Sequence, residues 1–128
     1  MTVRKPLVLV AGALQELAAG DSVAAAPLTW NTRTASYTLA IGDAENAVAM
    51  NVATANNLTV PPNSSVAFPV GTSILVYQEG VGLTTTFAGS GVTIVKRGSS
   101  LAMAGQYGLA TLVKRATDTW ILAGDIAA

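Results

Sequence analysis

Hydrophobic and small polar residues alternate through much of the chain, which is the pattern of β-strands that bury one face. The alternation is clearest where Tyr37, Leu39 and Ile41 are separated by small residues, and it recurs at 48–52, 58–60, 66–70 and 83–87. Prolines and glycines lie between these segments and supply the backbone angles that turns need. Short strands at this close spacing predict an all-β fold, a small antiparallel β-sandwich of jelly-roll-like form.

A single helical turn and a closing hairpin are the most specific local predictions. Asp43 is placed to act as the N-cap of a turn over residues 43–47. Near the end of the chain, residues 106–114 and 117–122 form a predicted strand pair joined by a tight turn at Arg115-Ala116. Helix is otherwise scarce in the pattern.

Three segments, residues 7–10, 74–77 and 120–123, are apolar at both odd and even positions. Such a strand is covered on both faces, either by its own chain or by a neighbouring chain. A surface poor in charge favours the neighbouring chain. The residues predicted to form an oligomer interface are Ile74, Val76, Trp120 and Leu122.

The chain divides unevenly into an N-terminal arm and linker, residues 1–28, and a β-module, residues 29–128. The arm is too short to fold alone, so it is expected to lie against the module, a sister chain or another protein. The alanine-rich run ending at Pro27 is the predicted linker. The residues predicted to dock the arm on a larger particle are Arg4, Lys5, Pro6, Leu7, Val8, Leu9 and Val10.

The composition favours association with other copies. Charged residues make up 11% of the 128 residues, against about 25% in an ordinary soluble domain. The formal net charge is zero, so the basic footprint of a nucleic-acid-binding protein is missing, and near-neutral chains associate readily. The apolar segment at residues 8–10 is too short to span a bilayer, and we expect a soluble chain made in a cytoplasm.

The residue inventory excludes much of enzyme chemistry. Without cysteine or histidine, the chain offers no disulfide, no ordinary zinc site, no thiolate and no imidazole base. Gly80-x-Gly82 and Gly89-x-Gly91 could cradle a phosphate, but neither continues into a dinucleotide or P-loop motif, and hairpin turns explain both better. We expect no cofactor.

The carboxylates leave two alternatives to the expectation of a non-enzymatic protein. Asp43, Glu45, Asp118 and Asp125 could ligate calcium, although an aspartate that begins a turn is more often a cap. A glycosidase would need two carboxylates across a cleft, and few aromatic residues are present to stack on sugars. The full acidic inventory is Glu16, Asp21, Asp43, Glu45, Glu79, Asp118 and Asp125.

Two pairs of basic residues, Lys96-Arg97 and Lys114-Arg115, lie at predicted strand ends. They could bind an acidic capsid surface or a glycan. Equally, they could guard strand edges against aggregation. The aromatic residues are spread one or two to a strand, which favours core packing over a stacking platform.

Several segments together resemble the β-module of phage tail-fibre and virion structural proteins. The closing segments YGLATLVK and DTWILAGD, and an opening RKPLVLV similar to the leader of phage fibre and minor tail proteins, agree in order with the central part of the chain. The segments are residues 4–10, 15–17, 20–21, 57–72, 74–80, 91–94, 107–114 and 118–125. The resemblance implies a non-catalytic role in the virion, and often a trimer.

A short arm that leads straight into one module favours a capsid decoration (cement) protein or a short head spike, attached through the arm. The alternative is a tail-fibre or tail-tip subunit that binds host surface glycan. The expected partners are copies of the chain itself and phage capsid or tail proteins, with no nucleic acid and no membrane insertion. The expected location is the virion, after synthesis in the cytoplasm of a bacterial host.

Overall fold

The computed structural model describes residues 7–10, 13–16 and 27–128. Regular structure in these residues is β except for one turn of 3-10 helix, η1 (Ile41–Asp43), and the predicted all-β class is confirmed. β1 (Leu7–Val10) and β2 (Ala13–Glu16) pair with each other antiparallel. The division of the chain near residue 28 stays a prediction, and most of the predicted linker lies outside the described residues.

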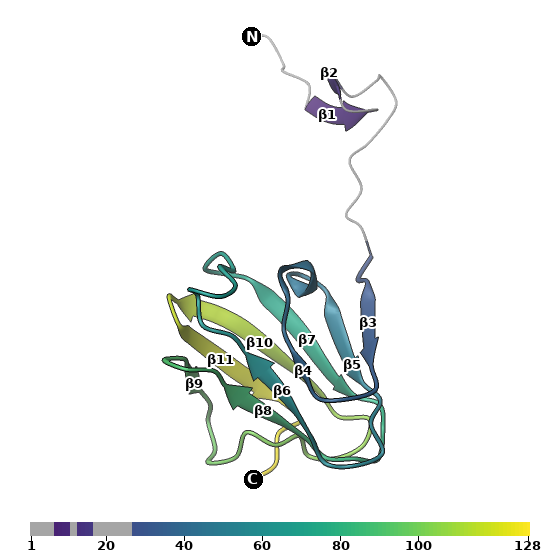
Figure 1. The fold of residues 1–128 in the computed structure, drawn as a ribbon, viewed down its shortest axis with the longest axis vertical. Helices are drawn as coiled ribbons and strands as arrows, with labels where there is room; N and C mark the ends of the chain where they lie inside the picture. The colour runs from purple at the N-terminus through teal and green to yellow at the C-terminus, as the bar shows by residue number, and fades with distance from the viewer. Residues whose placement is uncertain (1–6, 11–12, 17–26) are drawn as a thin grey trace.

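Two further sheets face each other and make up the module (Figure 1). The strands of the six-stranded sheet are, in spatial order, β3 (Trp30–Arg33), β5 (Ala47–Met50), β7 (Ser73–Gln78), β10 (Leu109–Ala116), β11 (Thr119–Gly124) and β9 (Thr93–Val95). The three-stranded sheet contains β4 (Tyr37–Thr38), β6 (Asn56–Val60) and β8 (Thr84–Ala88).

The chain crosses from one sheet to the other after each strand from β3 to β8. Neighbours within a sheet are therefore parallel: β3, β5 and β7 in the larger sheet, and β4, β6 and β8 in the smaller one. Only β7, β10 and β11 are antiparallel neighbours within these two sheets. The predicted antiparallel arrangement is wrong for most pairs, because alternation along a strand is the same in parallel and antiparallel sheets. Jelly-roll connectivity is not confirmed.

Because the chain passes alternately through the two sheets, it winds as a coil of stacked turns, each made of one strand from each sheet. The last two turns, β5–β6 and β7–β8, repeat after 28 residues. Ala47 pairs with Leu75, and Asn56, which pairs with Thr84, lies 28 positions before it. The loops that join the sheets stack in the same way, because the amides of Gly80 and Gly82 donate to the carbonyls of Met50 and Val52 at 3.0 and 2.9 Å. The module is thus a short two-sheet coil closed by the β10–β11 hairpin.

Buried polar side chains bond one another where the stacked loops pass from the larger sheet to the smaller one. Thr84 Oγ1 donates to Asn56 Oδ1 at 2.8 Å, and Gln78 Oε1 accepts from the Thr84 amide at 3.2 Å. The Asn56 amide group donates to the carbonyls of Thr54 and Gly82. Because these groups are satisfied inside the protein, the loops can stack without water between them.

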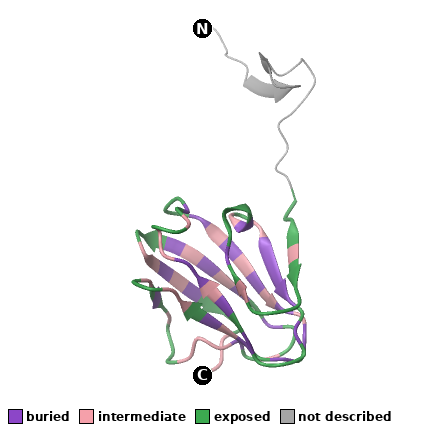
Figure 2. Cartoon of the chain, viewed as in Figure 1, coloured by how far each residue is buried: buried purple, intermediate pink, exposed green. Residues whose placement is uncertain are grey.

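The hydrophobic core lies between the two sheets. Buried and partly exposed residues alternate along β7, β10 and β11, which appears as bands in Figure 2. The Phe68 ring meets the Trp120 ring edge-on, with centroids 5.5 Å apart. The principal buried core residues are Leu39, Val48, Met50, Leu58, Val60, Phe68, Ile74, Val76, Met103, Leu112, Trp120 and Leu122.

The predicted strand at residues 66–70 is wrong. No regular strand occurs between β6 and β7, where Pro61, Pro62 and Pro69 lack the N–H groups that a sheet ladder requires. Phe68 is nonetheless buried, whereas Val70 is 61% exposed. The alternating pattern at residues 66–70 therefore corresponds to one buried core residue, Phe68, in a proline-rich loop, and not to a strand.

β8 is a strand, as predicted, but its buried face is the opposite one. Thr84 and Thr86 are fully buried, whereas Leu83 and Phe87 are 44% and 54% exposed. Within the described residues, Thr86 Oγ1 has no hydrogen-bond partner. The register with β6, in which Leu58 faces Thr86, decides the orientation.

The predicted cap and hairpin need small corrections. Asp43 closes η1 as its third residue, and its carboxylate accepts from the amide of Ala40 at 2.8 Å instead of capping a helix that follows it. The β10–β11 hairpin is confirmed, but the turn lies two residues later, at Thr117-Asp118, where Asp118 has a φ of 57°.

Substitution of Gly82 by alanine is expected to destabilise the module. A Cβ there would overlap the Thr54 backbone in the stacked loop, and overpacking of this kind costs about 1–3 kcal/mol. Gly105→Ala is the control, because nothing lies within 4 Å of that position. Urea unfolding measures both; equal midpoints would contradict the close stacking of the loops.

Candidate interaction surface

The outward side chains of the six-stranded sheet form a continuous surface, here called the outer face. Strand register places Trp30, Ala47, Leu75 and Thr111 in one row across the sheet. The full set is Trp30, Thr32, Ala47, Ala49, Ser73, Leu75, Tyr77, Thr93, Val95, Leu109, Thr111, Val113, Thr119, Ile121 and Ala123.

All of these outer-face residues are uncharged. Charge occurs just beyond the face, at the exposed Arg115 in the β-bulge between Lys114 and Ala116, and at Lys96, which follows Val95. Trp30, Val95 and Leu109 are 53%, 49% and 42% exposed. A sheet face with this many apolar residues and no charge is typical of an interaction surface.

The most prominent feature of the outer face is a pair of aromatic rings. Trp30 and Tyr77 meet edge-to-face, with centroids 5.8 Å apart and planes at 70°. They come from β3 and β7, which flank β5, so the rings approach each other above the small side chains of Ala47 and Ala49. These alanines are buried even though they lie on the outer face. Their small side chains leave room above β5 for the two rings to meet.

The four residues predicted to form an oligomer interface lie in the core of a single chain. Ile74, Val76, Trp120 and Leu122 are at most 2% exposed, which corrects that prediction. They occupy the inward positions of β7 and β11. The apolar residues between them face outward, and these include Leu75, Tyr77 and Ile121 on the outer face.

The residues predicted to dock the arm are only partly described. Leu7, Val8, Leu9 and Val10 form β1, and their strand partners run from Ala13 to Glu16. Arg4, Lys5 and Pro6 lie outside the described residues. The docking role stays a prediction.

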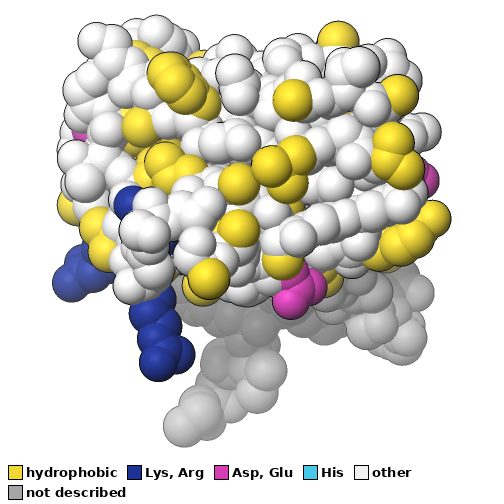
Figure 3. Space-filling model, turned by 90° about the horizontal axis from the view of Figure 1, so that it is seen from below, with side chains coloured by type: hydrophobic (Ala, Val, Ile, Leu, Met, Phe, Trp, Pro, Cys, Tyr) yellow, Lys and Arg dark blue, Asp and Glu magenta, His cyan; other side chains and the backbone are white. Residues whose placement is uncertain are grey.

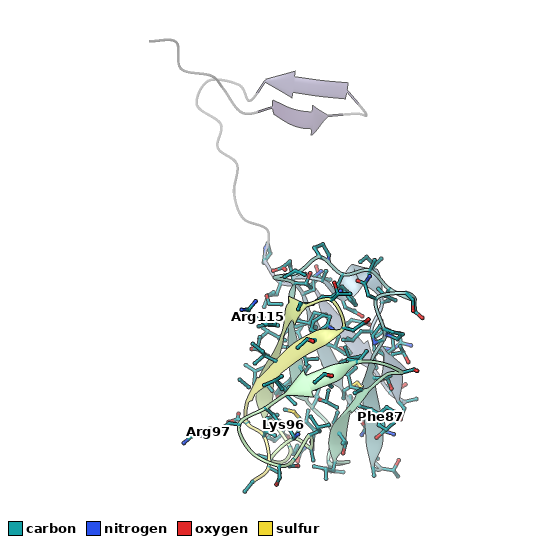
Figure 4. All side chains as sticks on the ribbon, turned by 90° about the vertical axis from the view of Figure 1, so that its left-hand side faces the viewer. Phe87, Lys96, Arg97 and Arg115 are labelled. Atoms are coloured by element: carbon teal, nitrogen blue, oxygen red, sulfur yellow. The ribbon has the colours of Figure 1, made fainter. Side chains whose placement is uncertain are left out.

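A groove of about 720 Å³ runs along β11 where β9 ends. Its lining is mainly apolar, with two cations, Lys96 and Arg97, at the end of β9. In Figure 4 Arg97 projects away from the body of the module, and Figure 3 shows lysine and arginine side chains gathered at one margin of that view. The lining residues are Val95, Lys96, Arg97, Gly98, Ile121, Leu122, Ala123, Gly124, Ile126, Ala127 and Ala128.

Lys114 is a structural residue, so the pair Lys114-Arg115 differs in role from the pair Lys96-Arg97. It is 2% exposed, and its Nζ donates to Asn63 Oδ1 and to the Phe68 carbonyl, both at 2.7 Å. It also lies 6.0 Å from the centre of the Trp120 ring. Lys114 therefore ties the proline-rich loop to the hairpin and is not available to a partner, whereas its neighbour Arg115 is exposed.

Asp43, the most buried carboxylate among residues 27–128, serves the fold. It accepts from Tyr37 Oη at 2.7 Å, from Asn31 Nδ2 at 2.9 Å and from the Ala40 amide. Burial of the phenol, followed by its hydrogen bond to Asp43, raises the pKa of Tyr37 above its usual value of 10.0. The guanidinium of Arg33 stacks 4.4 Å from the centre of the Tyr37 ring. This cluster holds η1, which links β4 to β5.

The other candidate carboxylates are held at separate places. Among the residues that the structure describes, no three acidic side chains come close enough to hold a metal ion. Each of three acids instead accepts from a different backbone amide: Glu45 from Ser73, Asp118 from Asn63 and Asp125 from Leu109. Gly80, Gly82, Gly89 and Gly91 all lie in loops between strands. The described part of the chain contains no helix of the length and hydropathy that a membrane span requires.

Comparisons with protein-family models, with curated proteins and with solved structures found no match. The functional argument therefore depends on the geometry of this chain.

The four interface residues predicted from the sequence lie on β7 and β11, two strands that also contribute outward residues to the outer face. The signal was present in the alternation of β7, since one parity of an apolar strand must face outward. The contribution of Trp30 was not foreseen, because β3 carries one aromatic residue among polar ones.

Proposed function

We propose that this chain is a non-enzymatic structural protein of a bacteriophage surface, a capsid decoration protein or short head spike. Copies of the chain associate through the outer face, as a trimer, and the N-terminal residues attach them to the particle. The resemblance of the sequence to phage virion modules supports the location. The outer face supports the assembly role, and it is the observation that carries the proposal.

A second copy of the chain fits the outer face better than a charged partner. Two uncharged faces can meet without placing like charges opposite each other, and no buried charge has to lose its water. The chain as a whole has a net charge of zero, so long-range repulsion between copies is small. An apolar strip repeated around a three-fold axis can be covered by its neighbours.

The use of the polar residues also supports a structural role. Asp43, Asp118 and Lys114 are each engaged in hydrogen bonds that hold loops in place. A glycosidase would need two free carboxylates facing a common cleft. The groove along β11 is lined by two cations and no carboxylate side chain.

Trp30→Glu is expected to weaken self-association. A tryptophan offers about 150–250 Å² of surface, and burial of the exposed half stabilises a contact by about 2–3 kcal/mol. The association constant should therefore fall by at least about tenfold, measured by sedimentation equilibrium of the full chain.

Phe87→Glu is the matched control, because Phe87 is 54% exposed on the smaller sheet and Trp30 is 53% exposed. This variant should associate like the unmodified chain. Equal loss of association in both variants, or no loss in either, would contradict a contact through the outer face.

A second candidate function is a tail-fibre or tail-tip subunit that binds host surface glycan. The outward side of the smaller sheet favours it, because Phe87 lies opposite Thr59 and next to the Asn57–Thr85 pair. An exposed ring among hydroxyl and amide groups suits a sugar. Under this alternative, Phe87→Glu lowers binding to host cells and leaves the number of copies per particle unchanged.

Deletion of residues 2–22 is expected to abolish incorporation into particles and to leave the β-module folded. The deleted segment contains the predicted docking residues and no strand of the two facing sheets. Gel densitometry of purified particles measures the copy number, and circular dichroism checks the fold. Normal loading of the truncated chain would overturn attachment through the N-terminal residues.

A further inference from the structure

The groove along β11 is a gap in the larger sheet. β9 pairs with β11 only as far as Val95 opposite Ile121, whereas β11 continues to Gly124. Beyond Val95 the chain turns away, and the resulting space is the groove, with Ala123 and Gly124 in its wall. An extended segment placed there would continue the line of β9 and add a strand beside β11, which is a common mode of peptide binding.

The β1–β2 hairpin has strand edges that could pair with a larger sheet. It forms a two-stranded sheet of its own, with four residue pairs. An isolated two-stranded hairpin of this kind is marginally stable in water. It gains stability when one of its edges adds to a larger sheet, because the unpaired N–H and C=O groups of that edge are then satisfied.

Charge indicates which segment of the chain fits the groove. Lys96 and Arg97 line it, and neither makes a salt bridge within the described residues. The sequence from residue 6 to residue 29 contains two charged residues, Glu16 and Asp21, both acidic. β2 ends at Glu16. Added antiparallel to β11, β2 places this end next to Lys96 and Arg97, which follow Val95 at the Ile121 end of the groove.

We propose that the β1–β2 hairpin of one copy adds β2 to the groove along β11 of a second copy. This contact rests on the proposed function only in requiring several copies, and it lies at the margin of the outer face. It joins two different surfaces, so repetition around a rotation axis closes a ring. It gives the N-terminal segment a role between copies, in addition to attachment to the particle.

Cross-linking with single cysteines tests the contact directly, because the natural chain has no cysteine. One tagged full-length chain carries Ala123→Cys. A second, differently tagged chain carries Leu14→Cys or Gln15→Cys, which lie on opposite faces of β2. Adjacent strands lie close enough for a disulfide, so one of the two mixtures should give a mixed disulfide on mild oxidation.

Charge reversal supplies the specificity control. Lys96→Glu with Arg97→Glu in the Ala123→Cys chain should lower the yield of mixed disulfide at least about tenfold, because like charges then meet. Glu16→Lys with Asp21→Lys in the other chain should restore it. A yield insensitive to both changes contradicts the proposal.

Two further outcomes would overturn it. A disulfide that forms only when both cysteines are in the same chain would mean that the hairpin fills its own groove. The lack of any mixed disulfide would rule out β2 of another copy as the segment that binds in the groove. Sedimentation of the same mixtures keeps the two proposals separate, because association through the outer face can persist when the disulfide is lost.

Discussion

The structure depends on the close stacking of successive turns of the chain. β5 and β7, and likewise β6 and β8, run parallel at an interval of 28 residues, and the loops between them bond through backbone amides. Gly80 and Gly82 permit the approach because a side chain at either position would meet the backbone of the previous turn. Once the turns are in register, every strand must place alternate residues inside and outside the coil.

This alternation connects the core to the interaction surface. The inward residues of β7, β10 and β11 fill the core, with Trp120 and Leu112 among the largest. The outward residues of the same strands are uncharged and mostly apolar, with Ser73, Thr111 and Thr119 as the polar ones, and they belong to the outer face. Asp43 and Lys114 are bonded inside the module, whereas Lys96, Arg97 and Arg115 lie near strand ends (Figure 4). A second copy can therefore approach the outer face without meeting charge.

The sequence was sufficient for the β class, for most strand positions and for the closing hairpin. It was not sufficient for strand direction, because residues that stack 28 positions apart, such as Asn56 and Thr84, are not alike, and no internal repeat is visible. The inward face of β8 could not be predicted either, since Thr86 lies inside and Phe87 outside. The four predicted interface residues face inward, and the sequence could not show this, because residues 74–77 and 120–123 are apolar at both odd and even positions.

The two tryptophans allow the central claim, that copies of the chain cover the outer face, to be tested in the unmodified protein. Trp120 is 1% exposed and Trp30 is 53% exposed, so a soluble quencher such as acrylamide reaches mainly Trp30 in a dissociated chain. Quenching should be measured across a dilution series in parallel with the sedimentation mass. The account predicts that the quenchable fraction of the emission falls as the mass rises. A Trp30 that stays equally accessible in the associated protein would contradict it.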